Sequence, residues 1–248
     1  MFDEEKLSTY LNRSKLLTNV SYEKKIRIAI LGSFTLNGLE ETIRVKCADK
    51  KIQCSIYVAG YNQYNQEILN KKSELYKFSP DITFLIIDSR DILGELFLNP
   101  YSISVQERKN LETEKNDAII NLAQTFVANS KSKLILSNFS IPSYSPIGIN
   151  EMKEEFGLHE MIGSLNHKIK TIFRSKPEIF IYDLNSFVTK FGEKNVFDYK
   201  QFFYGDVKVS LDHIPYLAEE FMGYIKAVLG LNKKCIVLDL DNTLWGGI

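Results

Sequence analysis

The hydrophobic residues of the chain gather in short runs that are separated by longer polar stretches. Five runs are almost continuously apolar, at residues 26–31, 53–59, 82–88, 133–139 and 178–184. Continuous apolarity is typical of strands that are covered on both faces, as in parallel sheets. The spacers are long enough for crossover helices, which we expect at residues 38–50, 67–72, 104–130, 157–174 and 214–229. The pattern predicts an α/β fold, a three-layer α/β/α sandwich around a mostly parallel five-stranded sheet.

Two further segments flank this predicted domain. Residues 1–25 are polar but carry leucines at near-helical spacing, which predicts an amphipathic helix and a linker. A sixth apolar run, residues 234–240, follows the last predicted helix. We therefore divide the chain into an amino-terminal arm (1–25), an α/β domain (26–230) and a terminal segment (231–248).

Composition narrows the class of protein. The 248 residues are 44% hydrophobic and 25% charged, and 31 Lys and Arg balance 31 Asp and Glu. Without a net positive charge we expect no nucleic-acid partner. The apolar runs fall short of the ~18 residues of a membrane span, and acids stand where a signal peptide has its basic region. Three cysteines without zinc-ligand spacing fit a reducing compartment, so we expect a cytoplasmic protein.

The strongest chemical motif lies at the end of the sixth apolar run. Asp239 and Asp241 are two residues apart where the predicted strand ends, so both carboxylates can approach one point. Hard oxygen ligands of this kind suit Mg²⁺. One carboxylate can attack a phosphorus atom while the other transfers protons. The alternative is a strand that ends in solvated turn acids.

The string Asp239-Leu-Asp-Asn-Thr243 resembles motif I of the haloacid dehalogenase (HAD) superfamily, and the following Leu-Trp-Gly-Gly resembles its FkbH-like branch, subfamily IIIC. Upstream, four stretches resemble the amino-terminal domain of FkbH-like proteins: GSFT (32–35), GYNQYNQEIL (60–69), LYKFSPDITFLIID (75–88) and the FG…D pattern of Phe191, Gly192 and Asp198.

This resemblance implies a function. Asp239 would be the aspartyl nucleophile, and Asp241 would be the general acid/base. Both would be ligands of the Mg²⁺ cofactor. Thr243 would shape the substrate loop. FkbH-like proteins transfer a three-carbon glyceryl unit from a phosphorylated metabolite to an acyl carrier protein in polyketide-type pathways, which implies both as partners.

The HAD site needs further residues from strands that follow motif I: a Ser or Thr, a Lys and an acidic pair. The sequence ends at Ile248. We therefore expect the chain to be the amino-terminal part of a larger protein, with the first strand of an incomplete HAD domain. Alone, it should bind Mg²⁺ weakly or not at all and show negligible phosphatase activity.

A second candidate site lies after the first predicted strand. The amino-terminal domains of FkbH-like proteins are similar in fold to SGNH hydrolases, whose sequence blocks supply Ser, Gly, Asn and His. By that resemblance Gly32 and Ser33 match the serine block and Gly60 the oxyanion glycine. Arg90 stands in place of the asparagine, and Val209 in place of the histidine.

The valine leaves the role of Ser33 open, because it cannot accept the serine proton. Ser33 is a nucleophile if His213 replaces the histidine, which makes the domain an esterase or acyltransferase. Otherwise the domain is a degenerate binding or docking module, or Ser33 only caps a turn. The candidates for substrate binding are Gly32, Gly60, Asn62, Arg90 and Thr243. The loop at 137–148 is either a rim of the site or a long surface connection.

Overall fold

The computed structural model describes residues 5–17 and 21–232. The sixth apolar run and motif I, with Asp239, Asp241 and Thr243, lie outside the described residues. The division of the chain into three parts therefore stays a prediction, while the α/β domain can be followed from its first strand to its last helix.

The centre of the molecule is a five-stranded sheet in the order β2-β1-β3-β4-β5. Every neighbouring pair is parallel, which confirms the predicted fold class. The sheet consists of β1 (Lys24–Gly32), β2 (Ile52–Val58), β3 (Ile82–Ile86), β4 (Lys133–Ser137) and β5 (Ile179–Tyr182). The chain runs outward from β1 to β2 and then returns to the other side of β1. The strand order thus reverses between β1 and β3, where open parallel sheets bind ligands.

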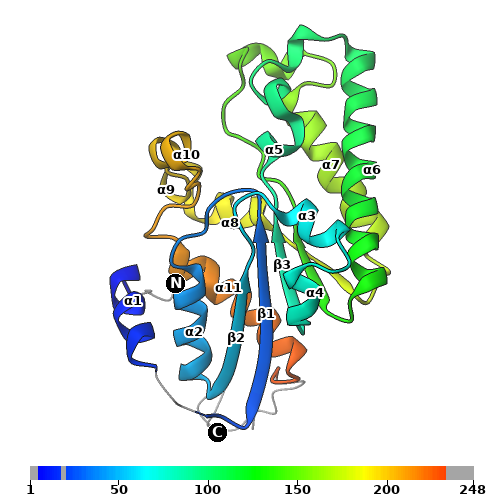
Figure 1. The fold of residues 1–248 in the computed structure, drawn as a ribbon. Helices are drawn as coiled ribbons and strands as arrows, with labels where there is room; N and C mark the ends of the chain where they lie inside the picture. The colour runs from blue at the N-terminus through cyan, green and yellow to red at the C-terminus, as the bar shows by residue number, and fades with distance from the viewer. Residues whose placement is uncertain (1–4, 18–20, 233–248) are drawn as a thin grey trace, which may run out of the picture.

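One face of the sheet is covered by α2 (Leu39–Asp49) and α11 (Ile214–Val228), with α1 (Leu7–Leu16) packed on α2 (Figure 1). Apolar side chains from β1, β3 and these helices form one core. Its centre includes Phe84 of β3 and Phe221 of α11, whose rings stack at 4.1 Å. Burying such large rings supplies much of the driving force for packing this layer.

The other face carries α3 (Tyr64–Leu69), α4 (Glu74–Phe78), α6 (Val105–Asn129) and α7 (Leu158–Phe173). A second core joins them to the sheet. The 25-residue α6 begins with a capping box, in which Ser104 and Glu107 satisfy each other's backbone N–H groups. The two faces together make the predicted three layers.

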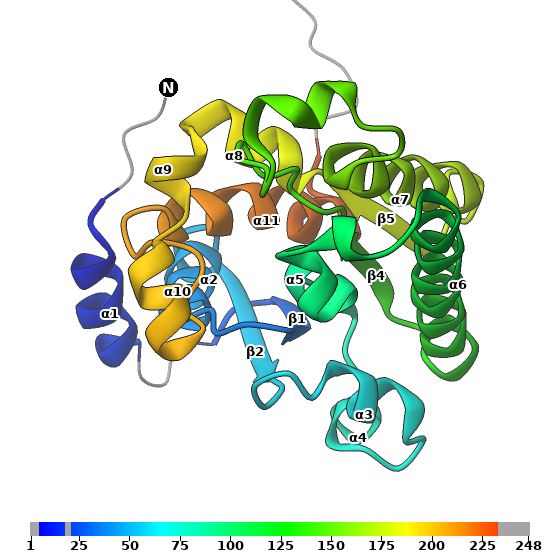
Figure 2. The same cartoon turned by 90° about the horizontal axis from the view of Figure 1, so that it is seen from above.

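Short elements surround the carboxyl end of the sheet. They are α5 (Ser89–Leu93), η1 (Gly94–Phe97), η2 (Pro100–Ser102), η3 (Gly148–Lys153), α8 (Leu184–Phe191), α9 (Glu193–Val196) and α10 (Tyr199–Gly205). Both views show α9 and α10 together on one side of this end and α5 on the other (Figure 2). The sequence pattern did not predict these elements, because most are too short for a hydrophobic period to show.

Candidate functional site

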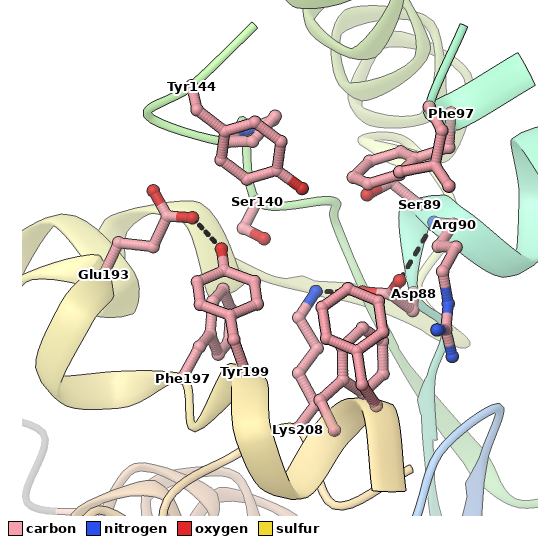
Figure 3. A pocket seen from close by; sticks show the side chains of 14 residues that line it. Asp88, Ser89, Arg90, Phe97, Ser140, Tyr144, Glu193, Phe197, Tyr199 and Lys208 are labelled. Atoms are coloured by element: carbon pink, nitrogen blue, oxygen red, sulfur yellow. Dashed lines mark hydrogen bonds and ion pairs between the residues drawn. The ribbon is translucent and has the colours of Figure 1, made fainter. Parts of the chain in front are cut away.

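A pocket opens at the carboxyl end of the sheet, between α5, the loop after β4 and the segment from α9 to α10 (Figure 3). The cavity itself has a volume of about 20 Å³, and the empty space is about 390 Å³ when the open mouth is included. Fourteen residues line it: Asp88, Ser89, Arg90, Phe97, Leu98, Ser140, Pro142, Tyr144, Glu193, Phe197, Tyr199, Phe202, Phe203 and Lys208. Its lining includes residues that follow β3 and β4, at the carboxyl end of the sheet, which is the end where open parallel sheets bind ligands.

A buried ion pair lies at the base of this pocket. The ammonium group of Lys208 contacts the carboxylate of Asp88, and their side chains are only 6% and 3% exposed. Asp88 also caps α5, because its carboxylate accepts the backbone N–H of Arg90 at 2.9 Å. The Lys208 ammonium lies 4.3 Å from the centre of the Phe197 ring. Because a buried charge without a partner is costly, the pair ties the end of β3 firmly to the segment before α11.

Ser33 lies next to this pair but is not free. Its hydroxyl accepts the backbone N–H of Asp88 at 2.8 Å, and its own N–H donates to the carbonyl of Ile86 at 3.1 Å. The residue is 5% exposed. Gly32, just before it, packs closely, since a Cβ there would lie 3.1 Å from the carbonyl oxygen of Phe34. Both residues therefore hold the end of β1 against β3.

No imidazole of the described residues is hydrogen-bonded to Ser33. His213 lies at the start of α11, where its Nδ1 is 2.9 Å from the Ser210 hydroxyl and its ring packs against Tyr216. Burial lowers the pKa of His213, although the charge of Asp212 partly opposes this. Val209 is 1% exposed and joins the core. The sequence alternative of a Ser33–His213 pair thus has no contact in support of it.

Arg90 extends from α5 into the pocket. Its guanidinium group forms an ion pair with Asp206 and stacks on the ring of Phe202. Its guanidinium carbon lies 3.9 Å from the centre of the Phe202 ring. The Tyr61 hydroxyl donates to the same Asp206 carboxylate at 2.8 Å. Burial and this hydrogen bond raise the pKa of Tyr61. The charge of Arg90 is therefore already balanced within the protein.

The other candidates from the second strand's end lie away from this pocket. Asn62 donates its amide to the carboxylate of Asp91 at 3.0 Å, and the Tyr64 hydroxyl donates to the same carboxylate at 2.7 Å. Gly60 is exposed, and a Cβ there would lie 2.6 Å from the amide oxygen of Gln63. Arg90 is thus the predicted substrate-binding residue that lines the pocket, whereas Gly32, Gly60 and Asn62 do not.

Glu193 forms the opposite side of the pocket. It accepts the hydroxyl of Tyr199 and, at 2.6 Å, the backbone N–H of Ser143. Burial alone would raise its pKa, but these hydrogen bonds and the nearby Lys208 outweigh burial and lower the pKa. The carboxylate therefore stays charged and fixes the loop after β4 against α9.

The sequence reasoning missed Lys208, Ser140 and Glu193 as pocket residues. Lys208 occupied an unspecified position of the histidine block, and Glu193 directly follows the Phe191-Gly192 pattern. Ser140 lies in the loop at 137–148, for which the sequence left two interpretations open, a rim of the site or a long surface connection. The three residues are far apart along the chain, and the pattern of a single sequence does not indicate that they lie close together in the folded protein.

Within the described ranges, no group of three or more His, Cys, Asp or Glu residues is arranged to hold a metal ion. The predicted Mg²⁺ ligands Asp239 and Asp241 lie outside those ranges. None of the helices in the described part of the chain is long and apolar enough to cross a membrane.

The parallel sheet in the order 2-1-3-4-5, with helices on both faces and a pocket at its carboxyl end, defines a doubly wound α/β/α domain. A catalytic mutant of Axe2, an acetylxylan esterase from Geobacillus stearothermophilus, is similar in fold, with a TM-score of 0.50 and 12% identity over 87% of this chain and 98% of that one. The chain itself belongs to the family of FkbH N-terminal domains, whose profile matches residues 27–226.

A second solved structure has the same fold over nearly the whole chain. It is the N-terminal part of the protein BF1531 from Bacteroides fragilis, described as containing a phosphatase domain and complexed with Mg. The TM-score is 0.79 at 23% identity, and the alignment covers 98% of this chain. The chain spans 62% of the length of that structure. No curated protein matches the chain.

Proposed function

We propose that the chain is the amino-terminal part of an FkbH-like phosphatase and glyceryl transferase, which loads a three-carbon unit from a phosphorylated metabolite onto an acyl carrier protein. One observation carries the proposal: a domain of the FkbH N-terminal family at 27–226 is followed by an Asp-x-Asp-x-Thr motif that begins at Asp239. The Mg-complexed phosphatase domain of the similar Bacteroides fragilis structure supports it.

In this proposal the two carboxylates of motif I act on the phosphate. Asp239 attacks the phosphorus atom, Asp241 transfers the proton of the leaving group, and both hold Mg²⁺. The ion neutralises phosphate charge when it is bound. The α/β domain has a different task, because it contributes no such acid pair.

We propose that the α/β domain is a degenerate binding module that docks the carrier protein or its acyl cargo. Two observations favour this over an esterase. Val209 stands where a histidine base is expected and is buried in the core, and the Ser33 hydroxyl accepts a backbone N–H of Asp88. A serine without a base has little nucleophilicity.

Phosphate release tests the first part. The chain is extended through the later HAD segments and assayed with a phosphorylated three-carbon acid, Mg²⁺ and a phosphopantetheinylated carrier. We expect Asp239→Asn to lower the rate by about a thousandfold or more, as removal of a nucleophile does. Asp117→Asn on the exposed side of α6 is the matched control and should leave the rate unchanged. Residues 1–248 alone should release negligible phosphate. Equal rates for Asp239→Asn and the parent would contradict the assignment.

Two binding assays test the second part. A pull-down with the phosphopantetheinylated carrier should retain residues 1–248, and undetectable association at high micromolar concentration counts against a docking module. A fluorophosphonate probe should not label the chain. Labelling that disappears in Ser33→Ala would restore the esterase alternative.

A further inference from the structure

Two of the chain's three cysteines meet between α2 and β2, which pack side by side (Figure 1). Cys47 lies on α2 and Cys54 on β2, and their free thiols are hydrogen-bonded to each other. Cys54 shares its strand face with Ile52 and Ile56, and this face packs on the core that contains Cys47. A helix and the strand that follows it therefore hold the two sulfur atoms together.

The two thiols differ in their access to solutes. Cys47 is fully buried, and its Sγ also lies 3.8 Å from the Sδ of Met222 in α11. Cys54 is half-buried and lines a surface cavity of about 270 Å³, together with Arg44 of α2. A small solute that enters this cavity therefore meets the sulfur of Cys54, whereas Cys47 is covered by the core.

The surroundings of the pair favour a thiolate on Cys54. The hydrogen bond from Cys47 lowers the pKa of Cys54, and the positive charge of Arg44 adds to this effect. Burial and the charge of Glu40 oppose it but are outweighed. The same hydrogen bond, together with burial, raises the pKa of Cys47. Because the thiolate is the form that attacks an oxidant, Cys54 is the reactive sulfur and Cys47 stays a thiol beside it.

We propose that Cys54 and Cys47 are an oxidant-reactive pair, which hydrogen peroxide converts to a disulfide between α2 and β2. The Cys54 thiolate attacks one peroxide oxygen, the O–O bond breaks, and hydroxide leaves as Cys54 becomes a sulfenic acid. The Cys47 sulfur then attacks the Cys54 sulfur, the S–O bond breaks, and the Cys47 proton leaves with the hydroxyl group as water. The hydroxide takes up the proton that Cys54 had released, so two thiols and one peroxide give one disulfide and two waters. A thiol reductant reverses the change.

This modification site is separate from the proposed function. Its cavity shares no lining residue with the pocket at the carboxyl end of the sheet, among the residues that the structure describes. The inference therefore stands or falls independently of phosphate release and of carrier binding.

Mass spectrometry of residues 1–248 tests the proposal. The chain carries Cys235→Ser, so that Cys47 and Cys54 supply its only thiols. After brief treatment with dilute hydrogen peroxide we expect the intact mass to fall by about 2 Da, and dithiothreitol to restore it. Tryptic peptides should place the bond between Cys47 and Cys54. Because both cysteines are in place, this measurement does not depend on how a variant of either one folds.

Two matched variants in the same background identify the attacking sulfur. Cys47→Ala should stop at the sulfenic acid on Cys54, which dimedone labels. Cys54→Ala keeps only the buried Cys47 and should be labelled at least about tenfold more slowly. Equal labelling of the two variants would contradict the assignment of Cys54 as the attacking thiol. The proposal is also wrong if peroxide leaves both thiols free, including the case in which the chain gains about 16 Da by oxidation of a methionine instead.

Discussion

The ion pair of Lys208 and Asp88 is the residue-scale feature on which the pocket depends. It connects two segments 120 positions apart, and both side chains are almost completely buried. Each charge is tolerable there only because the other is present, since removing water from a lone ion costs far more than one contact returns. The Ser33 hydroxyl accepts a hydrogen bond from the backbone N–H of Asp88, so three segments of the chain meet at Asp88.

We predict that Lys208→Met lowers the free energy of unfolding by about 3 to 5 kcal/mol, because it leaves the Asp88 carboxylate buried without its cation. The double variant Lys208→Met with Asp88→Asn should recover most of the loss, because asparagine is uncharged and can still accept the Arg90 N–H. Urea unfolding measures both. Lys200→Met, on the exposed side of α10, is the control. A small loss in Lys208→Met would show that the carboxylate is not isolated from water.

His213 gives a second residue-scale prediction, which concerns pH. Burial lowers the pKa of His213 in the folded protein below its ordinary value of 6.5. Below about pH 6.5 the unfolded chain therefore binds a proton that the folded protein resists, so this residue lowers stability as the pH falls. Above that pH His213 is neutral in both the folded and the unfolded state, so it causes no loss of stability.

The test compares urea unfolding at about pH 7.5 and about pH 5.5. His213→Gln should show a smaller loss of unfolding free energy between the two than the parent. His167→Gln, an exposed residue of α7, serves as the control and should behave like the parent. An identical loss in His213→Gln and the parent would mean that His213 does not contribute to this pH dependence.

At the scale of elements, the long members of the fold follow local rules and the short ones do not. The five strands were predicted within a few residues, because each is an apolar run covered on both faces. The long helix α6 was predicted at 104–130 and spans Val105–Asn129, with its capping box at Ser104. By contrast, α5 and α9 are five and four residues long. The Arg90–Asp206 ion pair connects α5 to a distant segment, and the hydrogen bond from Ser143 N–H to Glu193 does the same for α9. These short elements build the pocket.

The candidate site was therefore less predictable than the fold. Arg90 was anticipated from its place after the third strand, and the ion pair with Asp206 and the stacking on Phe202 now account for its position. Lys208 was not anticipated, because its partner Asp88 is fixed by tertiary packing and not by local spacing. Asn62 was expected near a ligand, yet its amide is used in a bond to Asp91.

Gly38, which precedes α2, gives the element-scale prediction. Its φ is +84°, and a Cβ there would lie 2.7 Å from a methyl carbon of Leu7 in α1. We expect Gly38→Ala to lower the free energy of unfolding by about 1–2 kcal/mol, because alanine resists this backbone conformation and pushes against α1.

Gly163→Ala is the matched control, because Gly163 lies inside α7 with nothing within 4 Å of the added Cβ. It should raise the free energy of unfolding by about 0.5–1 kcal/mol, the helix preference of alanine over glycine. Urea unfolding of both variants gives the comparison. Opposite signs support the assignment of Gly38 to the left-handed region and to contact with α1. A gain of stability in both would contradict it.

For the whole molecule, one sheet supplies both cores. Side chains of β1 and β3 alternate between the core shared with α2 and α11 and the core shared with α6 and α7. Ile28 and Phe84 belong to the first core, and Leu31 and Leu85 to the second. The same backbone hydrogen bonds therefore support both layers of helices, and neither layer keeps its partner surface if the sheet separates.

We accordingly predict one cooperative unfolding transition for the described domain, in which a defect in either core lowers the stability of the whole. Phe221→Leu lies in the first core and Phe126→Leu in the second, and both parent rings are fully buried. Each variant should lower the free energy of unfolding by about 1 to 3 kcal/mol. Far-ultraviolet circular dichroism and tyrosine fluorescence should report the same urea midpoint within each variant. Separate midpoints for the two signals, shifted by only one of the two substitutions, would mean that the helix layers unfold independently and that the sheet does not couple them.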